Sequence, residues 1–304
     1  MAVQIEQLDS KIREIVPENA VLEQIAAGLT FTEGPIWCGD YLLFSDIPQN
    51  RIVRLQMFRH GPELTTFRHP SGNSNGLTLD RNGRLVACEH NTRRVTRTET
   101  DGTISVLADR YQGRRLNSPN DVVVRSDGSV YFTDPSYGLG NPPKWKELPH
   151  CGVYRVAPDG SIALVVNDFN MPNGLAFSPD ESVLYVNDSA ERHIRCFSVS
   201  PEGSLSNGRV FIEMKGTGAG VPDGMKVDQQ GNVYCTGPGG IWIMEPSGKC
   251  LGKILMPEQP ANFGWGDADW RTLYITARGS IYRLRLLAPG IPVGVQEWRQ
   301  PGSR

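Results

Sequence analysis

The chain has 304 residues, of which 33 are Gly and 22 are Pro, and its formal net charge is −2. Charges of both signs are mixed without a basic block, which gives little support to nucleic-acid binding. No stretch reaches the ~18 apolar residues of a membrane-spanning helix, and the charged N-terminus MAVQIEQLDSKIREIVPE has no apolar signal core. We therefore expect a cytoplasmic protein without a membrane partner, unless a signal sequence has been removed.

In chain order, the first expected element is an N-terminal extension, residues 1–20. The segment at about residues 20–30 is expected to supply one strand to the last repeat of the chain described next. Such a strand would close a ring of sheets and hide an edge that would otherwise be exposed.

Six similar phrases then follow one another along the chain. Each opens with a polar residue, usually before Gly, and continues with an alternating apolar run, an Asp-containing turn and a second apolar run. Alternation with period two predicts strands, and the turns predict hairpins. The phrases are TEGPIWCGDYLLFSD (32–46), SNGLTLDRNGRLVACE (74–89), PNDVVVRSDGSVYFTD (119–134), PNGLAFSPDESVLYVND (172–188), PDGMKVDQQGNVYCTG (222–237) and ANFGWGDADWRTLYITA (261–277).

The spacing of these phrases predicts the fold. Their opening polar residues are separated by 42, 45, 53, 50 and 39 positions, and a third apolar run follows several of the hairpins. A period of about 40–50 residues with about four strands per unit is typical of β-propellers. We therefore predict an all-β fold, a six-bladed β-propeller with four-stranded antiparallel blades, as a single domain over residues 1–304.

One connection is longer than a hairpin requires. Residues 135–152 contain PSYGLGNPPKWKELPHC, which is rich in Pro and Gly and carries Tyr137 and Trp145. Loops longer than ~12 residues are usually functional or disordered. We expect a lid over one face of the propeller, whose wall includes both aromatic residues, with a flexible insertion as the alternative. Farther along, Trp298 in the C-terminal tail could pack on the fold.

The opening residues of the six phrases predict a binding site. In a propeller these residues begin the innermost strands, so the six side chains should meet in a ring around the channel. They are Glu33, Asn75, Asn120, Asn173, Asp223 and Asn262. Two carboxylates in a ring without Lys or Arg would repel each other, and a bound cation removes that conflict. The donors are all oxygens, which suits Ca²⁺ or Mg²⁺. Turn formation alone would also explain each Asn, but it does not explain Glu33.

A second column of acidic residues ends the second run of four phrases. Its members are Asp46, Glu89, Asp134 and Asp188, and His90 follows Glu89 directly. These carboxylates could orient the ring or hold substrate hydroxyls; the alternative is surface-facing charge at strand ends.

The six cysteines contain no CxxC pair, which argues against a zinc cluster. Most lie within apolar runs, so we expect small buried side chains, with a disulfide as the alternative.

Several of these motifs resemble the senescence-marker-protein/gluconolactonase family (regucalcin and relatives), most closely its bacterial gluconolactonase branch. The organophosphate-hydrolysing diisopropylfluorophosphatase is similar. The motifs are TEGPIW, NSPNDVVVRSDGSVYFTDPSYG, MPNGLAFSPD, VNDSA and VPDGMKVDQQGNVY, and the resemblance covers about residues 31–280. It implies one divalent metal in the channel, bound by Glu33, Asn173 and Asp223, with Asn120 binding metal or substrate. Ser118 stands where the animal members carry an Arg that binds substrate, which weakens the transfer of their sugar-lactone preference.

The expected function is divalent-metal-dependent hydrolysis of a sugar lactone to its aldonic acid. One divalent cation is expected, with Ca²⁺ first and Mg²⁺, Mn²⁺ or Zn²⁺ as alternatives. Asp223 is the candidate general base, with metal-bound hydroxide as its rival, and Asn120 joins it as a catalytic candidate. The candidate substrate contacts are Asn75, His90, Asn120, Tyr137, Trp145 and Asn262.

Two other functions fit the same ring. One is an organophosphate-hydrolysing phosphotriesterase on the same metal site, and the other is a non-catalytic calcium-binding or interaction propeller. A pocket rich in hydroxyl partners would favour lactones, and a more apolar one organophosphates. The expected partner is a small-molecule lactone, and the chain is expected to be a monomer or a dimer.

Overall fold

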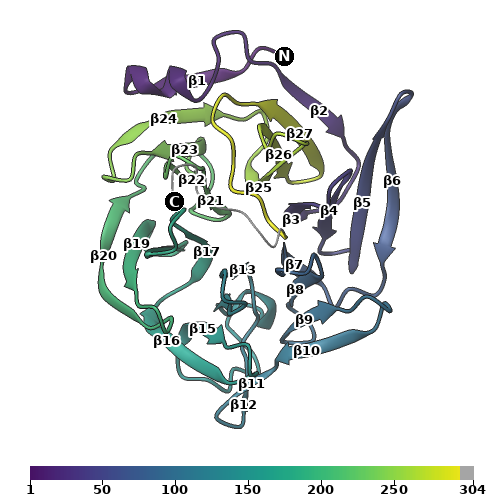
Figure 1. Cartoon of the computed structure of the whole chain (residues 1–304), viewed down its shortest axis with the longest axis vertical. Helices are drawn as coiled ribbons and strands as arrows, with labels where there is room; N and C mark the ends of the chain where they lie inside the picture. The colour runs from purple at the N-terminus through teal and green to yellow at the C-terminus, as the bar shows by residue number, and fades with distance from the viewer. Residues whose placement is uncertain (295–304) are drawn as a thin grey trace.

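Six antiparallel sheets stand side by side in a ring around a central channel (Figure 1). The computed structural model describes residues 1–294. In five blades four strands follow one another in sequence from the channel to the rim, and in the sixth the outermost strand comes from near the N-terminus. This arrangement confirms the predicted six-bladed β-propeller.

The six blades have the following strands. Blade 1 contains β3 (Thr32–Trp37), β4 (Tyr41–Asp46), β5 (Arg51–Phe58) and β6 (Gly61–Arg68). Blade 2 contains β7 (Ser74–Leu79), β8 (Leu85–Glu89), β9 (Arg94–Thr98) and β10 (Ile104–Ala108). Blade 3 contains β13 (Val122–Val124), β14 (Val130–Asp134), β15 (Cys151–Val156) and β16 (Ile162–Phe169).

The second half of the ring repeats this plan. Blade 4 contains β17 (Pro172–Phe177), β18 (Val183–Asp188), β19 (His193–Val199) and β20 (Leu205–Glu213). Blade 5 contains β21 (Met225–Val227), β22 (Val233–Gly237), β23 (Gly240–Met244) and β24 (Cys250–Leu255). Blade 6 contains β25 (Pro260–Gly266), β26 (Thr272–Ala277), β27 (Ser280–Arg285) and β2 (Leu22–Ala26).

The N-terminal segment closes the ring. Strand β2 pairs antiparallel with β27, with Leu22 opposite Leu284, which confirms the strand expected at about residues 20–30. Strand β1 (Gln4–Gln7) pairs with β24, so blade 5 has a fifth strand that the repeat did not predict. The 3-10 helix η1 (Ser10–Glu14) follows, and its Ile12 is fully buried in the core of blades 5 and 6.

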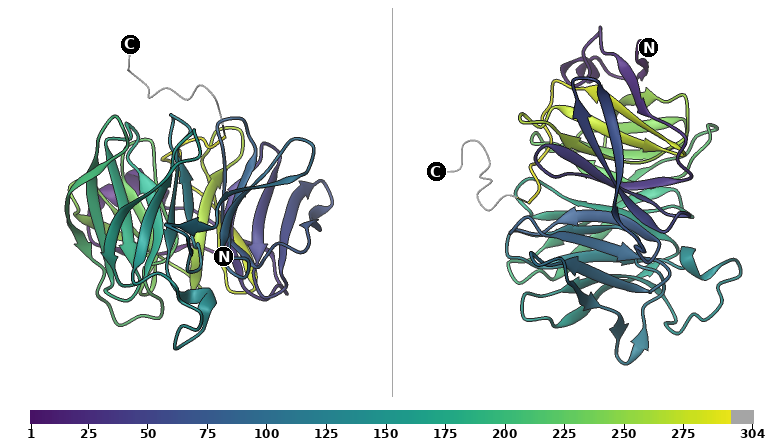
Figure 2. Two further views of the ribbon diagram at one scale, coloured as in Figure 1. Left: turned by 90° about the horizontal axis from the view of Figure 1, so that it is seen from below. Right: turned by 90° about the vertical axis from the view of Figure 1, so that its right-hand side faces the viewer.

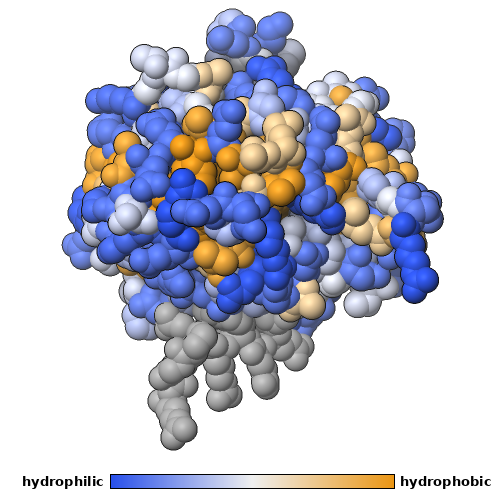
Figure 3. All heavy atoms as spheres, turned by 90° about the horizontal axis from the view of Figure 1, so that it is seen from above, coloured by the Kyte–Doolittle hydropathy of each residue, from blue (hydrophilic) through white to orange (hydrophobic). Residues whose placement is uncertain are grey.

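The apolar core lies between neighbouring blades, where each sheet packs its face on the next. Trp37 of blade 1 stacks on Tyr274 of blade 6 with ring centroids 5.2 Å apart, and Tyr234 of blade 5 meets the Trp265 ring of blade 6 edge-on. On the outer wall, apolar side chains appear between polar ones (Figure 3). All six cysteines are free and four of them are buried, which confirms their role as small apolar side chains.

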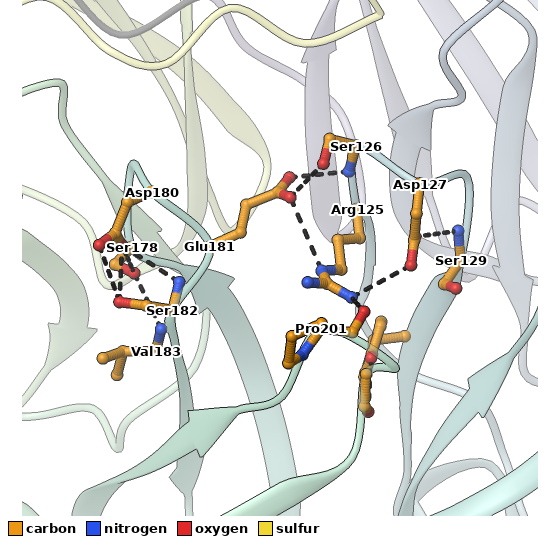
Figure 4. Close-up of polar contacts among 12 residues, drawn as sticks. Arg125, Ser126, Asp127, Ser129, Ser178, Asp180, Glu181, Ser182, Val183 and Pro201 are labelled. Atoms are coloured by element: carbon orange, nitrogen blue, oxygen red, sulfur yellow. Dashed lines mark hydrogen bonds and ion pairs between the residues drawn. The ribbon is translucent and has the colours of Figure 1, made fainter. Parts of the chain in front are cut away.

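Polar contacts also join blades where the inner hairpins turn. Arg125, in the β13–β14 turn, donates a hydrogen bond to the carbonyl of Pro201 in blade 4 at 2.9 Å. Glu181, in the β17–β18 turn, accepts one from the backbone N–H of Ser126 at 2.8 Å (Figure 4). These contacts connect blades 3 and 4 at the end of the channel away from the ring residues.

The two ends of the channel carry different segments (Figure 2). At one end, the chain after β27 crosses the propeller, where Gly290 bridges to Asp228. At the other end lie the hairpin of β11 (Arg110–Tyr111) and β12 (Arg114–Arg115) and the loop of residues 135–152, which contains η2 (Tyr137–Leu139). Among the residues described, no helix is long and apolar enough to cross a membrane. Trp298 lies outside the described residues.

Candidate functional site

The six predicted ring residues all lie where the inner strands begin, at the end of the channel that carries the 135–152 loop. Four are on inner strands, and Asn120 and Asp223 lie two residues before the first residues of β13 and β21. Apart from Asp223, which is partly buried, each is at most 6% exposed. The inner strands thus deliver the ring as predicted.

The recurring Gly after the ring residue has a packing cause. A Cβ atom on Gly34 would lie 2.2 Å from the carbonyl oxygen of Asn75, and one on Gly174 would lie 2.2 Å from that of Asp223. A Cβ on Gly224 would lie 2.2 Å from Oδ1 of Asn262. Each Gly therefore lets the ring residue of the next blade approach, which no other residue type allows.

Bulges accompany these glycines. The pairing of β3 with β4, of β7 with β8 and of β17 with β18 shifts register at the ring residue. Bulges redirect side chains and are common next to active sites. The Asn-Gly motif is therefore a strand feature that aims the ring residue, and not an ordinary hairpin turn.

Polar side chains of the second strands fix the ring backbone. Ser45 donates a hydrogen bond to the carbonyl of Asn75, and Thr133 to that of Asn173, both at 2.8 Å. Asn187 likewise donates through Nδ2 to the carbonyl of Asp223 at 2.6 Å. Each contact runs from one blade to the next, and sequence analysis did not identify these residues. Each of the three directly precedes a member of the acidic column, and this shared position is visible in the sequence.

The acidic column holds the loops that lead into the inner strands. Asp134 accepts hydrogen bonds from the backbone N–H groups of Asn117 and Ser118 at 2.7 and 2.8 Å. Asp188 does the same for Asn170 and Met171, and Asp46 for the backbone before Glu33. All four column members are at most 1% exposed, so the alternative of surface-facing charge is wrong.

Glu89 plays a different role from the three aspartates. It accepts hydrogen bonds from Arg94 at 2.6 Å, Thr96 at 2.8 Å and Arg68 at 2.5 Å. This network ties β8 and β9 of blade 2 to the end of β6 in blade 1. None of the column carboxylates is directed at the ring in these contacts, so they position the site rather than join it.

The two ring carboxylates have raised pKa values because they are buried beside like charges. Burial and the nearby Asp121 raise the pKa of Glu33 to about 7. Burial and Glu33 raise the pKa of Asp223 well above its ordinary value, against a hydrogen bond with Asn173. A carboxylate gains a proton more readily where no cation balances it. The ring is thus a place where added positive charge would be stabilised.

Lys226 and Asp121 complete the charged channel, and sequence analysis missed both. Lys226 Nζ lies 3.8 Å from Oδ2 of Asp121 and 3.4 Å from Oδ1 of Asn262. Oδ2 of Asp121 is buried and has no hydrogen-bond partner among the described residues. Three carboxylates and one ammonium give the channel a formal charge of −2, and this ammonium lies beside the ring without being one of its six members.

Two ring amides have partners within the chain. Asn262 donates through Nδ2 to Oε2 of Glu33 at 3.0 Å, and its Oδ1 accepts from Lys226, so it positions Glu33 rather than facing a substrate. Asn75 Nδ2 lies 3.2 Å from Nε2 of His90. Burial lowers the pKa of His90 to about 4, so at neutral pH the ring nitrogen accepts this hydrogen bond.

The lid loop brings one of its two predicted aromatics to the ring. The Tyr137 hydroxyl bonds with Ser189 and Asn173, while burial raises its pKa to about 12. Trp145, in contrast, is 80% exposed. Ser118 stands at the position where animal members of the family carry a substrate-binding Arg. Its hydroxyl accepts a hydrogen bond from the backbone N–H of Gly138 in the lid loop, at 2.9 Å.

The donor set fits a hard divalent cation. Glu33, Asn120, Asn173 and Asp223 offer carboxylate and amide oxygens, which Ca²⁺ and Mg²⁺ prefer. The channel charge of −2, with one unsatisfied oxygen on Asp121, matches the charge of one such ion. Within residues 1–294, no three His, Cys, Asp or Glu side chains form a metal-binding group, so the candidate site depends on its amide oxygens.

The chain is similar in sequence and fold to proteins named gluconolactonase and pentonolactonase. The family model described as "SMP-30/Gluconolactonase/LRE-like region" matches residues 31–279. The chain is 36% identical to the gluconolactonase of Zymomonas mobilis, over 92% of this chain and 85% of that protein. It is 30% identical to the pentonolactonase XacC of Haloferax volcanii, over 81% of each. Among solved structures, the gluconolactonase XC5397 of Xanthomonas campestris superposes with a TM-score of 0.84 and 33% identity, over 93% of this chain and 94% of that one.

Proposed function

We propose, from the premise that the chain belongs to the SMP-30/gluconolactonase/LRE-like family, that it is a lactonase which opens a sugar lactone to its aldonic acid with the help of one divalent cation. The observation that carries this proposal is the buried ring of oxygen donors around a channel of formal charge −2. The relatives named gluconolactonase and pentonolactonase support the substrate class.

Four residues would hold the cation: Glu33, Asn120, Asn173 and Asp223. When bound, a divalent cation supplies a Lewis acid that polarises the lactone carbonyl and stabilises negative charge on its oxygen. Neighbouring groups of the chain hold two of these donors in place. Asn262 and the backbone N–H of Gly34 hold Glu33, and the Asn187 amide holds the backbone of Asp223.

Asp223 is the proposed acceptor of the proton that leaves the attacking water. The residue as a whole is partly exposed, unlike the other ring members. Burial and the charge of Glu33 raise the pKa of Asp223 in the chain without a cation, and a bound cation would lower it again. Interaction with Asn173 acts against burial and also lowers this pKa.

The polar groups beside the ring favour a sugar over an organophosphate. Tyr137, Ser189 and His90 place hydroxyl and imidazole groups next to ring amides. Such groups can exchange hydrogen bonds with the hydroxyls of a sugar lactone, and the alkyl groups of an organophosphate offer no such partners. The site therefore matches the lactone alternative better than the phosphotriesterase alternative.

The direct test compares Asp223→Asn with the wild-type chain. Proton release from D-glucono-1,5-lactone and from a neutral organophosphate would be measured above the spontaneous rate, with the metal content of both proteins determined. We expect wild-type activity on the lactone and a loss of at least about a hundredfold in the variant. Asp101→Asn, on an exposed turn, is the matched control. Full turnover by Asp223→Asn with metal still bound would overturn the proton-acceptor role.

A further inference from the structure

A cleft opens beside the candidate site, between the lid loop and blades 2 and 3. Its volume is about 580 Å³, and its lining includes His90, Arg93, Arg115, Lys144, Trp145 and Glu147. Two contacts join it to the ring: His90 bonds to Asn75, and the lid backbone at Gly138 bonds to Ser118, two residues before Asn120. A substrate whose lactone carbonyl lies at the ring could extend a substituent into this cleft.

The cleft carries more positive than negative charge. Arg93, Arg115 and Lys144 are cations, and Glu147 is the carboxylate among the lining residues. His90 adds no charge at neutral pH, since burial lowers its pKa to about 4. Three cations against one carboxylate leave a formal surplus of +2, on a chain whose total charge is −2.

The two arginines are held in place by groups that do not neutralise them. Arg93 donates through Nε to the carbonyl of Leu116 at 2.7 Å, and Arg115 donates through Nη2 to the carbonyl of Thr92 at 2.9 Å. Carbonyl oxygens orient a guanidinium without removing its charge. Glu147 is 3.6 Å from Nη1 of Arg93 and also accepts from the backbone N–H of Arg115 at 2.8 Å, so one carboxylate serves both residues.

The burial of the Arg93 side chain gives the surplus of positive charge in the cleft its significance. The Arg93 side chain is only 7% exposed, whereas the Glu147 side chain is 39% exposed. The carbonyl oxygens of Arg115, Leu116 and Asn117 satisfy this buried guanidinium as a donor, and the partly exposed Glu147 is the carboxylate beside it in the cleft, so a further anion would help to balance its charge. The guanidinium group matches carboxylate and phosphate geometry, because it can donate two parallel hydrogen bonds. The cleft therefore has the chemistry of an anion subsite.

We propose that this cleft binds an anionic substituent, a carboxylate or a phosphate, on the lactone substrate. This inference rests on the proposed lactonase function and narrows its substrate class to acidic sugar lactones. Arg93 and Arg115 are its cations held by backbone carbonyls, and Lys144 on the lid loop is its solvent-exposed cation.

The test compares lactones that differ in charge. Values of kcat/KM would be measured for D-glucono-1,5-lactone, for its 6-phospho derivative and for a glucarolactone, which carries a carboxylate, at low and high salt. We expect the two anionic lactones to be preferred over the neutral one by about tenfold or more at low salt, and the preference to shrink with added salt. A larger preference for one of the two anions identifies the substituent.

Lys144→Glu links the preference to the cleft. This substitution should lower the ratio of anionic to neutral kcat/KM by about tenfold. Arg59→Glu, an exposed residue in the β5–β6 turn at the far end of the propeller, makes the same change in net charge and should leave the ratio unchanged. Equal ratios in the wild-type chain and in Lys144→Glu would overturn the inference.

Binding of the open-chain acids separates this inference from the proposed function. Calorimetry would compare 6-phosphogluconate with gluconate on the wild-type chain and on Lys144→Glu. If the chain hydrolysed no lactone but bound 6-phosphogluconate more tightly in a Lys144-dependent way, the anion subsite would stand and the lactonase proposal would fail. If it hydrolysed the neutral lactone and showed no preference for anions in either measurement, the lactonase proposal would stand and the subsite would fail.

Discussion

The backbone of Gly174 lies so close to that of Asp223 that a Cβ atom on residue 174 would stand 2.2 Å from the Asp223 carbonyl oxygen. The two residues belong to neighbouring blades, and Gly174 directly follows the ring residue Asn173. Gly174→Ala must therefore push two donors of the candidate metal site apart. We expect a loss of about 1–3 kcal/mol in the free energy of unfolding and at least about tenfold weaker Ca²⁺ binding by calorimetry.

Gly216→Ala provides a matched control for this substitution. The nearest atom to a Cβ on Gly216 is Cβ of Pro238, at 3.2 Å, and no ring residue is among its close neighbours. The control should retain Ca²⁺ affinity. Equal effects of the two substitutions would show that the close approach of the inner strands does not shape the ring.

Removing the ammonium of Lys226 should destabilise the channel. Lys226→Met leaves Asp121, Glu33 and Asp223 without a cation in the metal-free chain. We expect a loss of about 1–3 kcal/mol in the free energy of unfolding, measured with denaturant in the presence of chelator, since the Lys226 side chain is partly exposed. Asp121→Asn in the same background should recover part of the loss, and a double-mutant cycle measures the coupling. A coupling energy of zero would show that the 3.8 Å ion pair contributes nothing.

Cation binding should strengthen as pH rises. The pKa of Glu33 is raised from 4.5 to about 7, so below pH 7 a proton must leave this carboxylate when a cation binds. The apparent affinity should fall by about tenfold for each pH unit below 7 for each proton released. Calorimetry with Ca²⁺ between pH 5.5 and 8 measures this directly. A flat profile across that range would contradict the raised pKa.

The same shift predicts the pH dependence of stability without metal. A group with a raised folded pKa contributes stability that is present below its unfolded pKa of about 4.5 and is lost as pH rises through about 7. Chelated protein should therefore lose stability between pH 5 and pH 8, and saturating Ca²⁺ should remove this loss. Thermal unfolding with and without chelator tests both statements.

The Tyr137 hydroxyl should matter for turnover more than for folding. It bonds with Asn173 and Ser189 beside the ring, while the residue as a whole is 39% exposed. Tyr137→Phe should lower kcat/KM for the lactone by about tenfold, the equivalent of one hydrogen bond. Trp145→Ala, which removes an 80% exposed side chain, should leave the unfolding free energy within about 0.5 kcal/mol of wild type. A normal kcat/KM for Tyr137→Phe would place Tyr137 outside the reaction.

The repeat made the fold and the ring predictable because both depend on pseudo-symmetry. Each phrase opens an inner strand, so the positions of Asn75, Asn173 and their equivalents followed from counting phrases. The fifth strand β1 has no equivalent in the other blades, and for that reason it could not be predicted from the repeat.

Residues that break the symmetry were the ones missed or misplaced. Lys226 and Asp121 occupy positions that differ among the six phrases, so nothing in the repeat singled them out. The carboxylates of the acidic column bind backbone N–H groups of neighbouring loops, a role that depends on loop paths which no strand pattern encodes. Trp145 lies in the 135–152 loop, outside the repeat, and its side chain is exposed to solvent.

Metal dependence of lactone opening is the central claim, and one measurement tests it most directly. Proton release from D-glucono-1,5-lactone would be followed on chelated protein, and again after Ca²⁺, Mg²⁺, Mn²⁺ or Zn²⁺ is restored, with the spontaneous rate subtracted. We predict that activity disappears with the metal and returns with a divalent ion, Ca²⁺ first. Undiminished activity of protein shown to be free of metal would contradict the account of the ring given above.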